Sequence, residues 1–295
     1  MRKAELVETP KRRATRQAVA RTARIEAVHS SVPVMVLCGG EGTRLREETE
    51  LRPKPMLEIG SRPILWHIMK LYSSYGLTQF ILCLGYKGQV IKDYFLNYKT
   101  YSADLTVQLG APQAVRYHRH NGGDGEEDWR VTLVETGQKA QTGTRVARAS
   151  QYLTGDTFCL TYGDGLGDID INALLAFHAS HGKIATVTGV RPPGRFGELR
   201  VDETGRVNEF NEKLQTAEGM INGGFFVFRR AFIERYLQAD TDDCILEHEP
   251  LQQLAKDHQL IVYQHKGFWQ PMDTYREYRL LNELWTSGTA PWKVW

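Results

Sequence analysis

Short apolar runs alternate with segments of helical periodicity from Val34 to Val190. The apolar runs are rich in β-branched residues, and two of them stop at glycine, whereas the segments between them repeat apolar residues every three or four positions. Buried parallel strands are almost continuously apolar, so this alternation predicts an α/β fold with helices on both faces of a parallel sheet. The expected strands are Val34–Cys38, Phe80–Leu84, Val131–Thr136, Thr157–Asp164 and Ile184–Val190, and the expected helices are Ile64–Tyr75, Val90–Asn97, Thr142–Ala149 and Ile171–His181.

The pattern changes beyond Val190, where shorter and more aromatic strands are expected. No linker rich in Pro, Ser and Gly separates the two halves, so we expect one domain over 34–295. Its sheet should be Rossmann-like, mixed but mostly parallel, with a small additional β region in the C-terminal half. The expected elements are a hairpin of Gly197–Val201 and Val207–Phe210, strands over Ile221–Phe228 and Leu260–His265, and a helix over Thr274–Trp285.

The charge is concentrated at the N-terminus. Residues 1–33 hold eight Lys or Arg against three acidic residues, a net charge of +5, and the other 29 basic and 32 acidic residues leave the body at −3. The basic segment has no apolar core of a secretory signal, so we expect a disordered N-terminal arm, with a transit peptide as the alternative. An acidic body argues against a nucleic-acid partner, and no apolar run is long enough to cross a membrane.

Cysteine and histidine usage gives no metal-binding pattern. The four cysteines (Cys38, Cys83, Cys159 and Cys244) are widely separated and form no C-x-x-C pair, which favours free thiols and a cytoplasmic location. The region 116–130 combines histidines, glycines and acidic residues at irregular spacing. It is expected to be a surface loop rather than a metal site.

A glycine-rich turn follows the first expected strand. The sequence Cys38-Gly-Gly-Glu-Gly-Thr-Arg44 combines a turn whose N–H groups can surround an anion with a permanent positive charge at Arg44. The spacing fits neither a dinucleotide fingerprint nor a P-loop, because Leu45 stands where a third glycine would be required and no Gly-Lys-Ser/Thr follows. By itself the turn is as consistent with a plain tight turn as with a phosphate site.

Three further polar residues follow at positions suited to phosphate chemistry. Pro53 and Pro55 flank Lys54 and are expected to hold it on a stiff, non-helical segment. Asp164 ends an apolar strand in a glycine-rich turn, where it is either a Mg²⁺ ligand facing a polyphosphate or a turn former. Asp273 precedes the last helix, where it is either a second ligand or the N-cap.

Together these strings resemble the sugar-phosphate nucleotidylyltransferases, whose signature is G-G-x-G-T-R-L followed by P-K-P. The resemblance extends from Val34 to the C-terminus. Within that superfamily it is strongest to the glucose-1-phosphate cytidylyltransferases. The matching segments are Glu47–Gly76, Gly85–Phe95, Val131–Gly137, Thr161–Gly165, Pro192–Leu199, Ile221–Phe228, Glu249–Ala255 and Gly267–Thr274.

The resemblance implies an enzyme that makes CDP-glucose and diphosphate from CTP and α-D-glucose 1-phosphate with Mg²⁺. It also implies a homo-oligomer and a role in sugar-nucleotide biosynthesis, as for O-antigen. The implied catalytic residues are Arg44, Lys54, Asp164 and Asp273, of which Asp164 and Asp273 hold the metal. The implied nucleotide-binding residues are Leu37, Cys38, Gly39, Gly40, Glu41, Gly42, Thr43, Arg44, Lys54, Ala140, Arg145 and Gly163. The implied sugar-phosphate-binding residues are Lys213, Glu212, Gly197, Asn222 and Trp269.

The sequence departs from the family pattern at four positions. Cys38 replaces a small residue, usually alanine, and Glu41 replaces a frequent leucine, which puts an acid near the expected phosphates. Ala140 and Thr144 stand where the family usually has serine and glycine. These departures leave three alternatives open: a relative that uses UTP or dTTP, one that uses another hexose 1-phosphate, and a non-catalytic homologue that binds sugar nucleotides.

Overall fold

The computed structural model describes residues 32–110, 114–118, 127–191, 198–201, 206–211 and 219–295. The expected basic arm therefore lies outside the described residues except for Val32 and Pro33. The expectation that the arm and the body are separate units stays a prediction.

The main sheet is mixed, as expected from the sequence. Four of its strand pairs are parallel, including β10 with β15, and three are antiparallel among the described residues. The order across the sheet is β13 (Ile221–Asn222), β10 (Ala185–Val190), β14 (Phe226–Arg229), β8 (Thr157–Tyr162), β1 (Val34–Leu37), β4 (Gln79–Leu84) and β7 (Arg130–Glu135), and β15 is Leu260–Gln264. The α/β fold class is confirmed.

Alternation along β1 divides the interior into two cores. Val34 and Val36 belong to one hydrophobic cluster and Met35 and Leu37 to the other, because successive side chains of a strand point to opposite faces. Residues of α3, α7 and α10 pack in the first cluster, and residues of α6, α8 and α9 in the second. These helices are α3 (Ile64–Ser74), α6 (Thr142–Ala149), α7 (Ile171–His181), α8 (Ala231–Tyr236), α9 (Glu249–Lys256) and α10 (Tyr275–Thr286).

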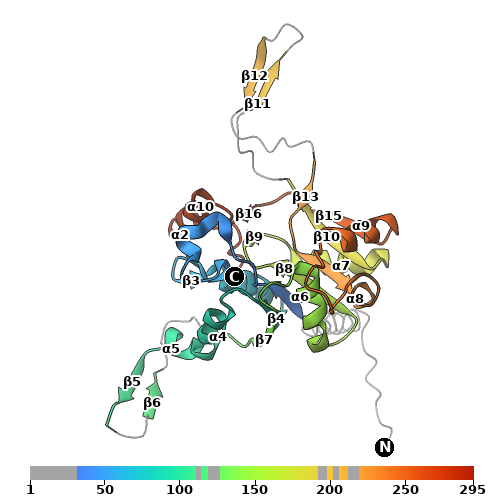
Figure 1. The fold of residues 1–295 in the computed structure, drawn as a ribbon. Coiled ribbons are helices and arrows are strands. Elements are labelled where there is room, and N and C mark those ends of the chain that lie inside the picture. The colour runs from blue at the N-terminus through green and yellow to red at the C-terminus, as the bar shows by residue number, and fades with distance from the viewer. Residues whose placement is uncertain (1–31, 111–113, 119–126, 192–197, 202–205, 212–218) are drawn as a thin grey trace, which may run out of the picture.

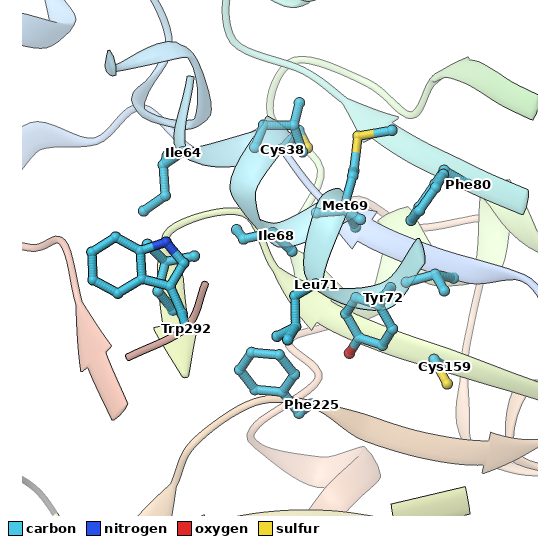
Figure 2. Packing of buried hydrophobic residues seen from close by; sticks show 14 of the residues in the cluster. Cys38, Ile64, Ile68, Met69, Leu71, Tyr72, Phe80, Cys159, Phe225 and Trp292 are labelled. Carbon is cyan, nitrogen blue, oxygen red and sulfur yellow. The ribbon is translucent and has the colours of Figure 1, made fainter. Parts of the chain in front are cut away.

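Helix α3 forms the centre of the first core. Figure 2 shows Ile68 and Leu71 of this helix between Cys38, the residue that follows β1, and the ring of Phe225. Trp292, from the C-terminal segment, is fully buried beside them. Since a buried aromatic side chain contributes several kcal/mol, the C-terminal segment is an integral part of the core.

One expected strand is interrupted. The sequence predicts a continuous strand over Ile221–Phe228, but the structure divides it into β13 and β14 at Gly223–Phe225. Gly224 has φ +74° and Phe225 has φ 48°, a left-handed backbone that cannot continue a strand. The break places Asn222 at the end of the short strand β13, beyond the ladder that joins β14 to β8.

Smaller elements surround the sheet. Two-stranded antiparallel pairs are formed by β2 (Glu58–Ile59) with β3 (Arg62–Pro63), β5 (Leu105–Gln108) with β6 (Ala114–Tyr117), β9 (Gly165–Gly167) with β16 (Trp269–Pro271), and β11 (Glu198–Val201) with β12 (Val207–Asn211). The β11–β12 pair is the expected hairpin. The remaining helices are α2 (Arg46–Thr49), α4 (Gly88–Leu96) and α5 (Tyr98–Ser102), with 3₁₀ turns at Thr43–Leu45, Lys54–Met56 and Ser150–Tyr152.

The hairpin of β5 and β6 was not expected from the sequence, which predicts a surface loop from 116 onward. It projects beyond α4 and α5, away from the sheet (Figure 1). The histidine- and glycine-rich part of that expected loop, 119–126, lies outside the described residues.

Candidate active site

A cavity of about 370 Å³ opens at the carboxyl ends of β1 and β8. Neighbouring parallel strands of an open α/β sheet end at the same edge, which is where ligands bind in such folds. The cavity is lined by Leu37, Cys38, Gly39, Gly40, Gly42, Arg44, Lys54, Pro55, Ala140, Gln141, Thr142, Arg145, Tyr162, Gly163, Asp164 and Asp273.

The glycine turn after β1 is shaped by close neighbours. Gly42 has φ +63°, and a Cβ there would lie 3.0 Å from the Thr49 methyl group. A Cβ on Gly39 would lie 2.2 Å from a guanidinium nitrogen of Arg145, closer than real Cβ atoms approach other atoms. Both positions therefore require glycine. At these two positions the backbone itself lines the cavity.

Lys54 is one of two buried cations that line the cavity. Its Nζ donates to Oδ2 of Asp164 and to Oδ1 of Asp273, each at 2.6 Å. Pro53 is extended, as expected, but Lys54–Met56 then forms one 3₁₀ turn, so the expectation of a wholly non-helical segment was wrong. Pro55 lies within this turn at a position where its missing N–H is not required.

The charges at Lys54 stabilise one another. Burial lowers the pKa of the Lys54 ammonium, but the charges and hydrogen bonds of Asp164 and Asp273 outweigh that effect, and its pKa lies above the ordinary value. Burial raises the pKa of Asp273, but hydrogen bonds and charge from Lys54 and then from Arg44 bring it below the ordinary value. Arg44 Nη1 lies 3.0 Å from Asp273 Oδ2, and its side chain is 74% exposed. It is therefore accessible to a ligand.

The structure excludes one of the two roles open for Asp273, that of the N-cap. Thr274 is the N-cap of α10 and, with Glu277, forms a capping box, so the Asp273 carboxylate is not needed at the helix end. Asp273 instead reaches Lys54 beside Asp164, although the two acids are 109 positions apart in the sequence. Tertiary contact alone brings them together.

The two carboxylates fit a hard divalent cation. Magnesium prefers oxygen ligands and is commonly held by one or two carboxylates together with substrate phosphates. The described residues contain no cluster of three or more His, Cys, Asp or Glu able to hold a metal. The pair already attracts a positive charge, that of Lys54. Oxygens of a bound polyphosphate would complete the coordination.

Arg145 is buried against backbone oxygens. Its guanidinium donates to the carbonyls of Leu84, Gly39, Gly137 and Gln138 at 2.7–3.3 Å and to the Thr136 hydroxyl at 2.9 Å. It thereby ties together the segments that follow β1, β4 and β7. Burial lowers the pKa of this guanidinium, which nevertheless remains charged at all ordinary pH values.

Comparison with known proteins agrees with this arrangement. The sequence profile described as Nucleotidyl transferase matches residues 33–279. The chain belongs to the nucleotidyl transferase family. Among the described residues, no helix is long and apolar enough to span a bilayer.

Curated members of this family resemble the chain over nearly their whole length. The glucose-1-phosphate cytidylyltransferase of Salmonella typhi is 48% identical over 262 residues, which are 88% of this chain and 98% of that protein. The probable glucose-1-phosphate cytidylyltransferase of Bacillus subtilis is 43% identical over 261 residues, 88% of this chain and 99% of that protein. Among solved structures, HddC from Yersinia pseudotuberculosis aligns with a TM-score of 0.60 at 22% identity, covering 86% of this chain and 99% of that one. This last likeness shows the shared fold.

The cavity brings together most residues that the sequence predicted for the nucleotide. Ten of the twelve predicted nucleotide-binding residues line it, with Asp164 and Asp273. Glu41 is not among the lining residues, and the side chain of Thr43 is outside what the structure describes. Glu41 is exposed to solvent. Thr144 is also outside the lining, because it is fully buried and its hydroxyl donates to Thr241 O at 2.8 Å.

Sequence reasoning missed four lining residues: Pro55, Gln141, Thr142 and Tyr162. Tyr162 is the last residue of β8, directly before Gly163 and Asp164, so its position at a strand end was a usable signal. Gln141 and Thr142 begin α6, and their place beside the glycine turn depends on the packing of that helix. The resemblance implied nucleotide contacts for the stretch Glu135–Arg145 that contains them, but it did not single out these two residues.

The residues predicted for the sugar phosphate are only partly described. Asn222 is exposed, and its Nδ2 donates to the hydroxyl of Tyr162 at 3.1 Å, which places it next to the cavity lining. Trp269 lies on β16 and donates from Nε1 to Gly223 O at 2.8 Å. Gly197, Glu212 and Lys213 lie outside the described residues.

Proposed function

We propose that this protein is a glucose-1-phosphate cytidylyltransferase, which converts CTP and α-D-glucose 1-phosphate into CDP-glucose and diphosphate. The observation that carries the proposal is the meeting of Lys54, Asp164 and Asp273 beside the glycine turn, in a chain 48% identical to a curated enzyme of that name. Other curated relatives are named mannose-1-phosphate guanylyltransferases, but the first of them is 27% identical.

The reaction is a substitution at phosphorus. A phosphate oxygen of glucose 1-phosphate attacks the α-phosphorus of CTP, a P–O bond forms, and the bond from the α-phosphorus to the diphosphate breaks. The nucleophile is already an anion, so no general base is required. The main obstacle is the repulsion between two polyanions. Cations and backbone N–H groups lower the activation free energy because they neutralise this charge and orient the two substrates.

The cavity residues supply those groups. Backbone N–H groups of Gly39–Gly42 can approach the triphosphate closely, because no side chains project from the glycines of this turn. Arg44, the exposed cation, is suited to the β- and γ-phosphates. Lys54, the buried cation, is suited to the α-phosphate, where charge accumulates during the substitution.

Asp164 and Asp273 would hold Mg²⁺ together with phosphate oxygens. A bound divalent ion neutralises developing negative charge on the phosphate oxygens and aligns the two substrates. Lys54 occupies the space between the same two carboxylates in this structure. Phosphate binding would give the ammonium a new partner and leave both carboxylates free to bind the metal.

The sugar is assigned to the side of the cavity beside Tyr162. Asn222 lies there with an exposed amide, and Trp269 contacts the adjacent residue Gly223 through its indole N–H. Glu212, Lys213 and Gly197 complete the proposed sugar-phosphate set from the matching family segments.

Pyrophosphate release tests the proposal directly. The purified protein is incubated with Mg²⁺, glucose 1-phosphate and one of CTP, UTP, dTTP, ATP or GTP, and the expected result is turnover with CTP. Replacing glucose 1-phosphate with mannose 1-phosphate tests the sugar. Turnover with UTP or dTTP but not CTP would overturn the nucleotide assignment, and binding of CDP-glucose without any turnover would establish the non-catalytic homologue.

We also propose that the protein is a homo-oligomer whose contacts include the β5–β6 hairpin. The cross-strand pairs Leu105–Tyr117 and Val107–Val115 alternate with Thr106–Arg116 and Gln108–Ala114, which puts the larger apolar side chains on one face of the ribbon. That face is open: Val107 and Val115 are each 43% exposed, and the adjacent Leu109 is 93% exposed. An isolated two-stranded ribbon is marginally stable in water, so a covering partner is needed.

The oligomer proposal is tested by light scattering after size-exclusion chromatography. Val107→Asp on the apolar face should lower the measured mass to that of a smaller species. Gln108→Asp, one residue away on the opposite face, is the matched control and should leave the mass unchanged. A monomeric wild-type protein would refute the proposed oligomer and leave the proposed reaction unaffected.

A further inference from the structure

A chain of hydrogen bonds connects helix α6 with strand β13 through Glu247. The two carboxylate oxygens of Glu247 accept from different hydroxyls: Oε1 from Tyr162 at 2.6 Å and Oε2 from Thr142 at 2.7 Å. The Tyr162 oxygen accepts in turn from Asn222 Nδ2 at 3.1 Å. Glu247 thus lies between Thr142 and Tyr162, both of which line the cavity.

The direction of each hydrogen bond follows from the carboxylate. An ionised carboxylate only accepts, so both hydroxyl protons must point to Glu247. The Thr142 oxygen is then free to accept from Leu246 N at 2.9 Å, and the Tyr162 oxygen from Asn222. Burial, followed by the charge of Glu247, raises the pKa of Tyr162 well above its ordinary value, so the phenol keeps its proton.

The Asn222 amide is thereby fixed in one of its two orientations. Its Nδ2 donates to Tyr162, and its Oδ1 accepts from Gly224 N at 2.9 Å. A flipped amide would lose both bonds, because Gly224 N–H cannot accept and the Tyr162 proton is already committed to Glu247. One N–H of the amide has no partner among the described residues and is available to a hydroxyl group.

Glu247 is itself held in place by helix α6. The segment 239–247 runs against the first turn of that helix, where the N–H groups of Gly143 and Thr144 both donate to Cys244 O at 2.9 and 3.1 Å. Gln141 N donates to Asp242 O, and Arg148 pairs with the Asp242 carboxylate at 2.8 Å. The position of the carboxylate therefore depends on the same helix that contributes Gln141 and Thr142 to the cavity.

We propose that Glu247 is a positioning residue for the sugar: through the Tyr162 hydroxyl it sets the amide of Asn222 to donate to a hydroxyl of the glucose moiety. This inference rests on the proposed function, and it adds a residue that would not touch the substrate. The other carboxylate oxygen joins this orientation to Thr142 on the nucleotide side of the cavity.

The test is a steady-state analysis of Glu247→Gln, which preserves size and shape but introduces a donor. The Gln amide N–H would donate to a hydroxyl that now donates to Glu247. If that hydroxyl belongs to Tyr162, its proton is free to point to Asn222, and the Asn222 amide is no longer held in one orientation. The KM for glucose 1-phosphate should rise about tenfold, while the KM for CTP stays within about twofold. Tyr162→Phe, which retains the ring packed against Phe226, should raise the same KM.

Two controls separate positioning from general stability. Glu249→Gln changes an exposed acid on the first turn of α9 and should leave both KM values and the thermal midpoint unchanged. In an Asn222→Ala background, Glu247→Gln should have no further effect on the KM for glucose 1-phosphate, because its action passes through that amide.

Unchanged KM values in both Glu247→Gln and Tyr162→Phe, with an active wild-type enzyme, would overturn the positioning role and leave the proposed reaction intact. Additive effects of Glu247→Gln and Asn222→Ala would overturn it as well. An inactive wild-type protein would instead refute the proposed function.

Discussion

Lys54 and Arg145 are two buried cations of the same cavity, and their partners are of opposite kinds. Lys54 is 8% exposed and lies between two carboxylates, Asp164 and Asp273. Arg145 is 5% exposed and donates to four backbone carbonyls and one hydroxyl. None of the hydrogen-bond partners described for Arg145 is an acid.

The difference indicates which cation can act on a ligand. Carboxylates are side chains whose partner can be exchanged for a metal or a phosphate, so Lys54 can change partners when the substrate binds. Carbonyl oxygens belong to the backbone that shapes the cavity, so Arg145 cannot leave them without freeing three strand ends. We therefore assign Lys54 to charge neutralisation, and Arg145 mainly to holding the nucleotide cavity open in its functional shape.

The largest effect is expected from Lys54→Met. Turnover should fall by about a hundredfold to a thousandfold, because the cation at the reacting phosphate is lost. The thermal midpoint should fall only moderately, because Asp164 and Asp273 lose their shared partner but are partly exposed to water. Pyrophosphate release and thermal unfolding measure the two quantities.

Asp164→Asn should cause a loss of turnover of similar size, because it removes one of the two oxygen ligands proposed for the metal.

Lys70→Met is the matched control for Lys54→Met, because Lys70 also pairs with a carboxylate, that of Glu127, but does not line the cavity. It should retain normal turnover. Normal activity in Lys54→Met would remove the distinction between the two cations, and a collapse of its thermal midpoint would make Lys54 a structural residue instead.

Arg145→Met should show the converse pattern. Five acceptors lose their donor and several of them are buried, so the free energy of unfolding should fall by about 3–5 kcal/mol. Denaturant unfolding measures this loss. Arg145→Lys should rescue little, since one ammonium cannot reach acceptors spread over three strand ends. A stable Arg145→Met protein with a raised KM for CTP would instead make Arg145 a direct nucleotide ligand.

His67 is a third buried basic side chain. Unlike Lys54 and Arg145, it is neutral when it is buried. It is fully buried in α3, its Nε2 lies 2.9 Å from Ile59 O, and burial lowers its pKa to about 4. Because that pKa is below the unfolded value of 6.5, the stability from the neutral ring is complete above about pH 6.5 and is lost as pH falls toward 4.

The expected size of that loss is about 3 kcal/mol for the 2.5-unit difference in pKa. Denaturant unfolding at several pH values should show it in the wild type and show a flatter dependence in His67→Gln. Equal slopes in the two proteins would mean that folding does not shift the pKa of His67. His248→Gln, at an exposed histidine, serves as the control.

The smallest effect is expected from Thr144→Gly, which restores the residue usual in the family. The free energy of unfolding should fall by about 1–2 kcal/mol, because glycine weakens helix α6 and the hydrogen bond to Thr241 O is removed. The KM for CTP should not change, since Thr144 does not line the cavity. A large change in that KM would show that the cavity responds to packing beneath α6.

Much of the fold could be predicted from the sequence. The bounds of α6 and α7 agree with the expected helices. Six strands agree with the expected strands within two residues at either end: β1, β4, β7, β8, β10 and β15. Their signals are local, namely apolar runs stopped by glycine and helical periodicity. The prediction failed at Gly223–Phe225, where a left-handed backbone interrupts a sequence that is otherwise typical of a strand.

The candidate site was predicted as a set of residues but not as an arrangement. The glycine turn, Lys54, Asp164 and Asp273 carry recognisable strings, so the family and its chemistry followed from the sequence. The same strings gave no indication that Glu41 would be exposed, or that Tyr162 and Thr142 would share the carboxylate of Glu247.

By itself the sequence determined the alternation of strands and helices, the family and the identity of the charged groups, because these depend on residues close together along the chain. Only the tertiary structure decided which charges meet. Asp164 and Asp273 come from different elements, and Arg145 reaches three strand ends at once. Whether a buried cation is paired with an exchangeable acid or with fixed carbonyl oxygens depends on packing between distant segments, and local sequence does not encode that packing.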